Sequence, residues 1–154
     1  MAKEIERKYL LKSLPNLPYN RHSSIEQFYI YSTSPEIRLR RYNDDEFMLT
    51  IKNSGSLVRD EVEIPVTESF YYDNLAWVGK TPIKKEYYVY DHEGYKIEVS
   101  VVDDTFTYAE VEFSSIQEAE EYTFPWKDIL IEEVTYRPEY KMRNYWVYRH
   151  LRQY

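Results

Sequence analysis

The sequence has no cysteine and only three glycines among its 154 residues. Without cysteine, the chain can form no disulfide, thiol nucleophile or zinc–thiolate site. A glycine-rich phosphate loop needs several glycines close together, whereas Gly55, Gly79 and Gly94 stand far apart. Any phosphate group that this protein binds must therefore be held by side chains.

The sequence also lacks a long apolar run and an excess of basic residues. No segment approaches the roughly 18 consecutive apolar residues of a membrane-spanning helix, and charged residues begin at Lys3. The formal net charge of −7 repels nucleic acid and anionic lipid. We therefore expect a cytoplasmic protein with no nucleic-acid or membrane partner. Nothing in the sequence decides for or against a homodimer.

Strand-forming residues are abundant, since aromatic residues make up 18% of the chain and 18 of them are tyrosines. No repeat or interdomain linker divides the chain, so residues 1–154 are expected to form one domain. Helices are expected over 67–76, 115–122 and 140–151. Eight segments alternate between polar and apolar residues with period two and predict a barrel or a strongly curved sheet: 4–10, 26–32, 37–42, 47–52, 58–64, 85–90, 95–102 and 107–113.

The charged residues of these strands share one face of each strand. Glu4, Glu6 and Lys8 point the same way, as do Arg38 and Arg40. One interpretation is an ordinary half-exposed sheet with a solvated charged face. However, like charges two residues apart repel unless an opposite charge lies between them. If helices and loops cover the apolar faces, the charged faces line a tunnel instead.

Such a tunnel would carry both kinds of group that phosphoryl transfer needs, namely cations for the developing charge and ligands for a metal that orients the nucleophile. Side chains that could hold phosphates are Lys8, Arg38, Arg40, Lys52, Arg59 and Lys85. Hard oxygen ligands suited to Mg²⁺ or Mn²⁺ are Glu4, Glu6, Glu61, Glu63, Glu98, Glu110 and Glu112.

An ordered set of motifs resembles the CYTH superfamily, also called triphosphate tunnel metalloenzymes. The run Glu4-Ile5-Glu6-Arg7-Lys8 is similar to the family's ExExK motif, and the likeness continues through 37–40, 49–52, 59–63, 97–99, 109–113 and 140–141. The resemblance covers essentially the whole chain. It implies an α+β fold, an eight-stranded antiparallel closed β-tunnel with helices packed outside, including a C-terminal helix. It also implies Mg²⁺ or Mn²⁺ as cofactor and a small-molecule triphosphate or polyphosphate as partner.

The resemblance also assigns roles to residues. It implies phosphate binding by Lys8, Arg38, Arg40, Lys52, Arg59 and Lys85. It places Glu4, Glu6, Glu98, Glu110 and Glu112 at the metals, and gives Lys8, Glu61 and Glu63 catalytic roles such as positioning the water. The chain departs from the family's usual pattern at Ser100, where an Asp is common, and at Tyr87, where an Arg is common. Glu139 and Met142 are further departures, near the final Tyr-Lys pair.

Metal-dependent hydrolysis of a triphosphate is the reaction that we predict. An adenylate cyclase of the class IV type is an alternative, but it needs a nucleoside pocket that the sequence does not identify. A thiamine triphosphatase would need aromatic residues at the mouth of the tunnel to bind the thiamine rings. The third alternative is a protein that binds a polyphosphate or nucleotide without turnover, and Ser100 and Tyr87 favour it.

Overall fold

The structure is a computed structural model that describes residues 2–151, except for the side chain of His150. Its β-strands are β1 (Ala2–Leu11), β2 (Arg21–Tyr31), β3 (Glu36–Tyr42), β4 (Glu46–Lys52), β5 (Val58–Pro65), β6 (Ile83–His92), β7 (Tyr95–Val102), β8 (Phe106–Glu112) and β9 (Leu130–Glu133). Its helices are α1 (Glu68–Val78), α2 (Ile116–Glu121), the short 3₁₀ helix η1 (Pro138–Tyr140) and α3 (Met142–Leu151).

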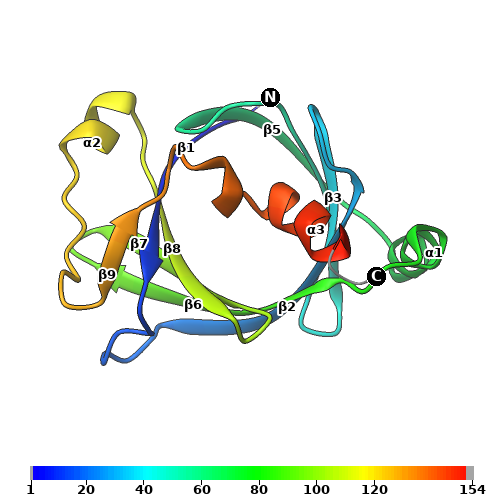
Figure 1. Ribbon diagram of the computed structural model, residues 1–154, viewed down its shortest axis with the longest axis horizontal. Coiled ribbons are helices and arrows are strands. Elements are labelled where there is room, and N and C mark those ends of the chain that lie inside the picture. The colour runs from blue at the N-terminus through cyan, green and yellow to red at the C-terminus, as the bar shows by residue number, and fades with distance from the viewer. Residues whose placement is uncertain (1, 152–154) are drawn as a thin grey trace.

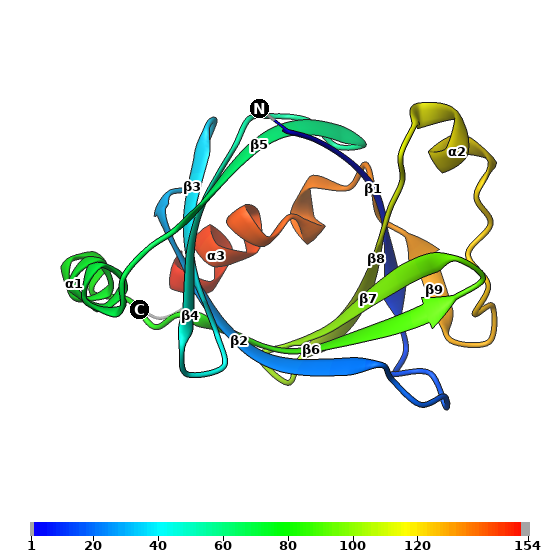
Figure 2. The same cartoon turned by 180° about the vertical axis from the view of Figure 1, so that it is seen from behind.

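Eight strands close into a ring in which every pairing is antiparallel (Figures 1 and 2). The order around the ring is β5-β4-β3-β2-β6-β7-β8-β1, and the additional pairing of β1 with β5 closes it. The ninth strand, β9, is attached beside β1 on the outside of this seam. The predicted α+β fold and closed antiparallel tunnel are thereby confirmed.

Two apolar clusters cover the wall of the ring. In the first, Tyr9 and Val111 on β1 and β8 pack with Phe124 and Trp126 from the segment that carries α2. In the second, Phe28 packs with Tyr71 of α1, with 5.1 Å between the ring centroids. Because the apolar faces are buried by these outer layers, the charged faces of the strands point into the ring, as expected for a tunnel.

The helices lie outside the strands, and local sequence sets their ends. Thr67 caps α1 by accepting a hydrogen bond from the backbone N–H of Phe70 at 3.1 Å, and Gly79 ends the helix in the left-handed conformation. Ser115 caps α2 in the same way through the N–H of Glu118. None of the helices within residues 2–151 is long and apolar enough to span a membrane.

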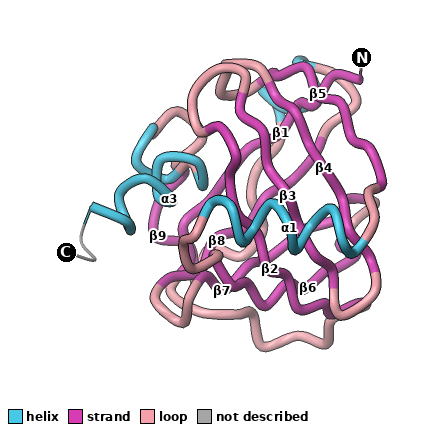
Figure 3. Tube along the Cα trace, turned by 90° about the vertical axis from the view of Figure 1, so that its right-hand side faces the viewer, coloured by secondary structure: helices cyan, strands magenta, loops and turns pink. Residues whose placement is uncertain are grey.

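The C-terminal helix α3 lies across one opening of the tunnel. In Figure 1 it appears within the outline of the ring, and the quarter-turned view of Figure 3 places it at one side of the barrel. Its residues Met142 and Trp146 are buried, and the Trp146 ring lies 5.9 Å from that of Tyr29 on β2. The helix starts two residues later than we predicted because Pro138 opens the separate 3₁₀ turn η1 before it.

Candidate active site in the tunnel

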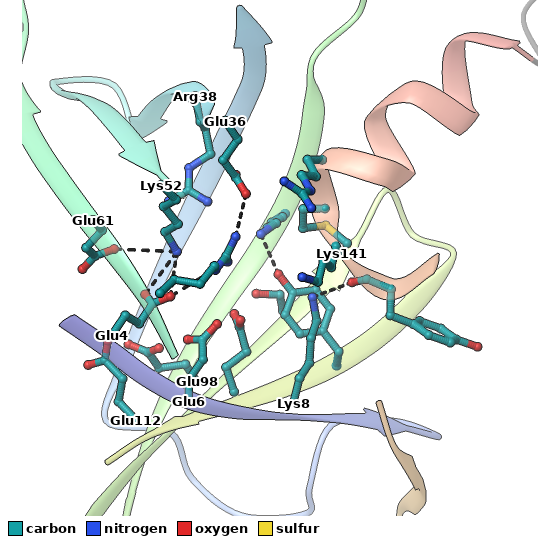
Figure 4. A pocket seen from close by; sticks show the side chains of 18 of the residues that line it. Glu4, Glu6, Lys8, Glu36, Arg38, Lys52, Glu61, Glu98, Glu112 and Lys141 are labelled. Atoms are coloured by element: carbon teal, nitrogen blue, oxygen red, sulfur yellow. Dashed lines mark hydrogen bonds and ion pairs between the residues drawn. The ribbon is translucent and has the colours of Figure 1, made fainter. Parts of the chain in front are cut away.

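The ring encloses a cavity of about 270 Å³ (Figure 4). All six cations singled out in the sequence line it: Lys8, Arg38, Arg40, Lys52, Arg59 and Lys85. All seven carboxylates line it as well: Glu4, Glu6, Glu61, Glu63, Glu98, Glu110 and Glu112. They meet there because each occupies an alternate position on a strand of the ring, so that the side chains of one strand share its inner face.

Several carboxylates gather toward one end of the tunnel. In Figure 4 Glu4, Glu6, Glu98 and Glu112 lie together at one end, whereas Lys8 lies toward α3. The ammonium group of Lys8 donates a hydrogen bond to the backbone carbonyl of Tyr140, in η1, at 2.6 Å. Glu98 and Glu112 also line a second cavity, with residues 93–96 of the β6–β7 hairpin and with Glu118 of α2. The tunnel therefore has an acidic end, and Lys8 lies away from it.

Three carboxylates at the acidic end converge. One oxygen each from Glu4, Glu6 and Glu112 can be chosen so that all lie within 4.8 Å of one another. Burial raises the pKa of Glu6 well above its usual range, and the negative charges of Glu110 and Glu4 add to this shift. Desolvation, with the charges of Glu4 and Glu98, raises the pKa of Glu112 to about 7. A divalent cation would relieve this repulsion, and an all-oxygen ligand set suits Mg²⁺ or Mn²⁺.

The other two predicted metal ligands lie beside this cluster. Glu98 accepts a hydrogen bond from the Tyr87 hydroxyl at 2.6 Å, and burial raises the pKa of its carboxyl group. Glu110 faces Lys8 across the β1–β8 pair. Burial alone would raise the pKa of Glu110, but the positive charge of Lys8 and a hydrogen bond with Glu6 hold it well below its usual range.

Two of the cations are neutralised by carboxylates within the tunnel. Lys52 donates to both carboxylate oxygens of Glu4, at 2.9 and 3.1 Å, and its ammonium lies 3.7 Å from Glu61. Arg59 donates to Glu36 at 2.6 Å. Each charge of these pairs has an opposite charge beside it, so neither pair needs a ligand to balance its charge.

Other cations are held by neutral partners. The amide oxygen of Gln27 accepts from Nε and Nη2 of Arg40, at 3.0 and 2.7 Å, and the Tyr42 hydroxyl accepts from Nη1 at 2.9 Å. Lys85 donates to the Tyr108 hydroxyl at 2.6 Å. Burial and the charge of Arg40 together hold the pKa of Lys85 well below its usual range. A bound polyanion would add negative charge to that of Glu110 and so stabilise the charged forms of these side chains.

Arg38 belongs to the same part of the tunnel. It is buried, and its Nε has no hydrogen-bond partner among residues 2–151. A buried guanidinium N–H that lacks a partner is costly, so it marks a place where a ligand oxygen would be bound favourably.

Several lining residues were not predicted as site residues. Glu36 shares a strand face with Arg38 and Arg40, so alternation could have indicated it, but the predicted strand began at Ile37. Tyr108 also lines the tunnel, and the buried Gln27 holds Arg40 without lining the cavity; neither carries a charge, so the charge pattern did not indicate them. Lys141 also lines the tunnel, and its ammonium donates to the carbonyl of Gly55, in the loop between β4 and β5.

The fold and the cavity define a class of protein: a closed antiparallel β-tunnel with a charged interior and a carboxylate cluster at one end. The chain belongs to the CYTH family, because the model of the CYTH domain matches residues 2–135. The crystal structure of the inorganic triphosphatase NE1496 is similar to it, with 26% sequence identity, a TM-score of 0.66, and coverage of 94% of this chain and 95% of that one.

Two archaeal structures share the fold. The PH1012 protein from Pyrococcus horikoshii OT3 is 18% identical with a TM-score of 0.57, and covers 76% of this chain and 83% of its own. A conserved hypothetical protein from Pyrococcus furiosus is 21% identical with a TM-score of 0.57, and covers 76% of this chain and 82% of its own. No curated protein sequence matches the chain.

Proposed function

We propose that this protein hydrolyses inorganic tripolyphosphate to pyrophosphate and orthophosphate with the help of Mg²⁺ or Mn²⁺. The observation that carries the proposal is the adjacency of two features in one tunnel: cations held by neutral partners, and the carboxylate cluster of Glu4, Glu6 and Glu112. The first suits a chain of phosphates and the second suits a divalent metal. The similarity to the inorganic triphosphatase NE1496 supports the same reaction.

The nature of the tunnel wall favours an inorganic substrate over a nucleotide. Tyr42, Tyr87 and Tyr108 line the cavity, but each hydroxyl is hydrogen-bonded to a charged side chain of the tunnel. A nucleoside would need an apolar or stacking surface for its base. Tripolyphosphate has no such part, and it would match the cations of the wall directly and the carboxylates through a bound metal ion.

In the proposed reaction, water attacks the terminal phosphorus atom. A new P–O bond forms, the bridging P–O bond breaks, pyrophosphate leaves, and a carboxylate takes the proton of the water. Arg38, Arg40 and Lys85 would hold the phosphate oxygens and stabilise the transition-state charge. Glu61 and Glu63, predicted to position the water, lie on β5 at the wall of the tunnel. A bound Mg²⁺ or Mn²⁺ would neutralise phosphate charge and lower the pKa of water.

The test offers tripolyphosphate, ATP and thiamine triphosphate to the purified protein with Mg²⁺, with Mn²⁺ and with EDTA, and measures orthophosphate, pyrophosphate and cyclic AMP. We expect equal amounts of orthophosphate and pyrophosphate from tripolyphosphate, only when a metal is present. Glu6→Gln and Arg40→Ala should each remove most of this activity. Tight binding with no turnover under either metal would instead identify a binding protein, and cyclic AMP with pyrophosphate from ATP would identify a cyclase.

A further inference from the structure

One buried tyrosine of the tunnel touches two of its lysines. Tyr108 lies on β8 with only 1% of its surface exposed. Its hydroxyl accepts a hydrogen bond from the ammonium of Lys85 at 2.6 Å. The ammonium of Lys8 lies over its ring, 3.9 Å from the centroid. The phenol therefore contacts one lysine through its oxygen and the other through its π face, which attracts cations.

The hydroxyl that holds Lys85 is neutral, and the carboxylate whose charge acts on both lysines is Glu110, two residues along β8. Ser100 lies directly opposite Tyr108 in the register of β7 and β8, at the position where the family often has an aspartate. Lys85 lies opposite Val102 in the register of β6 and β7. Because an ammonium has three N–H donors and the Tyr108 hydroxyl takes one, roughly two remain for a ligand. A tyrosine can thus fix the lysine without neutralising it, whereas a carboxylate in its place would compete with phosphate.

We propose that Tyr108 is a positioning residue that fixes Lys85 through its hydroxyl and Lys8 through its ring, so that both ammonium groups point to the same stretch of a phosphate chain. The inference rests on the proposed function because it takes the ligand to be a phosphate chain. It also gives a physical reason for Ser100 at a position where the family often has an aspartate. The neutral hydroxyl of Ser100 is compatible with a site in which a phenol, and not a carboxylate, holds Lys85.

A double-mutant cycle tests the inference. The affinity of metal-free protein for tripolyphosphate is measured by calorimetry for wild type, Tyr108→Phe, Lys85→Met and the double variant. We expect Tyr108→Phe to weaken binding roughly tenfold, as for loss of a hydrogen bond to a charged group. The double variant should bind no more weakly than Lys85→Met, since the hydroxyl acts through Lys85. Tyr108→Leu should weaken binding further, and this extra loss should disappear in a Lys8→Met background.

The matched control is Tyr9→Phe. Tyr9 is also a buried tyrosine, but it lies in the outer cluster on the other side of the wall, and its hydroxyl has no hydrogen-bond partner among residues 2–151. This variant should bind tripolyphosphate as wild type does. Circular dichroism and thermal unfolding establish that each variant is folded.

A second measurement uses the wild-type protein and does not depend on the folding of a variant at Tyr108. The NMR signals of the Lys8 ε-methylene group should be shifted upfield by the Tyr108 ring current, and tripolyphosphate should perturb the signals of both lysines. An unshifted Lys8 signal would overturn the inference. Wild-type affinity of the Tyr108→Phe variant for tripolyphosphate would also overturn it. So would a loss of affinity on Tyr108→Phe that is the same in the wild-type and Lys85→Met backgrounds.

These measurements separate this inference from the proposed hydrolysis. If wild-type protein binds tripolyphosphate but releases no phosphate with either metal, the hydrolysis proposal fails and the cycle still decides the role of Tyr108. If wild-type protein hydrolyses tripolyphosphate and Tyr108→Phe binds it equally well, the role of Tyr108 fails alone. Absence of any tripolyphosphate binding would overturn both.

Discussion

Glu6 and Glu112 lie directly opposite each other in the antiparallel register of β1 and β8. Like charges in such cross-strand positions destabilise a sheet. Here Glu4 joins the pair, so that oxygens of three carboxylates lie within 4.8 Å. The register of the tunnel thus holds together groups that repel one another until a proton or a metal ion is bound.

The first prediction concerns pH and metal. The folded pKa values of Glu6 and Glu112 are raised, the latter to about 7, whereas an unfolded chain titrates near 4.3. The folded state therefore binds more protons between these values, and its stability falls as pH rises through this window. We expect the Tm of the metal-free protein to fall between about pH 5 and pH 8 because of these groups, and Mn²⁺ to restore it most at pH 8.

Thermal unfolding in EDTA and in Mn²⁺ checks this first prediction. In the metal-free Glu112→Gln variant, the fall in Tm over the same pH range should be smaller than in the metal-free wild-type protein. A pH-independent Mn²⁺ effect would contradict the assignment of the cluster as a metal site.

The second prediction concerns the ion pair between the buried Glu36 and the partly buried Arg59. Glu36 is only 3% exposed, and Glu36→Leu would leave the guanidinium of Arg59 without its 2.6 Å partner. Breaking a fully buried pair costs about 3 kcal/mol or more, and we expect at most about this loss of unfolding free energy here, because Arg59 keeps Glu4 at 3.9 Å. Urea unfolding measures the loss. Lys3→Ala is the control, because it breaks an exposed pair with Asp60 and should cost about 0–1 kcal/mol.

The third prediction compares two adjacent lysines. Lys85 is buried in the tunnel, whereas Lys84 is exposed on the opposite face of β6. Lys85→Met should lower kcat/KM for tripolyphosphate by about 10²-fold, as expected for a group that stabilises transition-state charge. Lys84→Met removes the same charge and should leave kcat/KM nearly unchanged. Equal losses would indicate that net charge, and not the tunnel, governs the reaction.

The fourth prediction concerns the hydrogen bond from Tyr87 to Glu98. Burial raises the pKa of Glu98, and the Tyr87 hydroxyl lowers it by stabilising the carboxylate. Tyr87→Phe should therefore raise the pKa of Glu98 further and weaken Mn²⁺ binding more at pH 6 than at pH 8. Calorimetric titration at the two pH values provides the measurement. Unchanged affinity at both would place Glu98 outside the metal site.

Period-two alternation predicted the strands of the ring because each has an apolar face to bury. It failed where backbone pairing with a neighbouring strand, and not the alternation of polar and apolar residues, determines the extent of a strand. β2 begins at Arg21, five residues before the predicted start, because polar residues 21–24 pair by backbone with β6. β9 has only four residues, and it exists because β1 offers it an edge outside the ring.

The charged lining of the tunnel was predictable for the same reason as the strands. The neutral side chains that hold its charged groups were not. Gln27 matters because Arg40 on β3 reaches it across the sheet, and Tyr108 on β8 matters because it meets a lysine from β6, two strands away. Such roles depend on which strands are neighbours, and this information is absent from the pattern of any single strand.

The strand that carries the ExExK run is also the one that closes the ring, since β1 pairs with both β5 and β8. Glu4 lies at this seam opposite Arg59, and Glu6 lies opposite Glu112. Completion of the barrel and assembly of the acidic cluster are therefore a single event. A chain whose first strand has come away would lose two of the three converging carboxylates, Glu4 and Glu6, together with its enclosure, and only Glu112 of that cluster would stay on the wall.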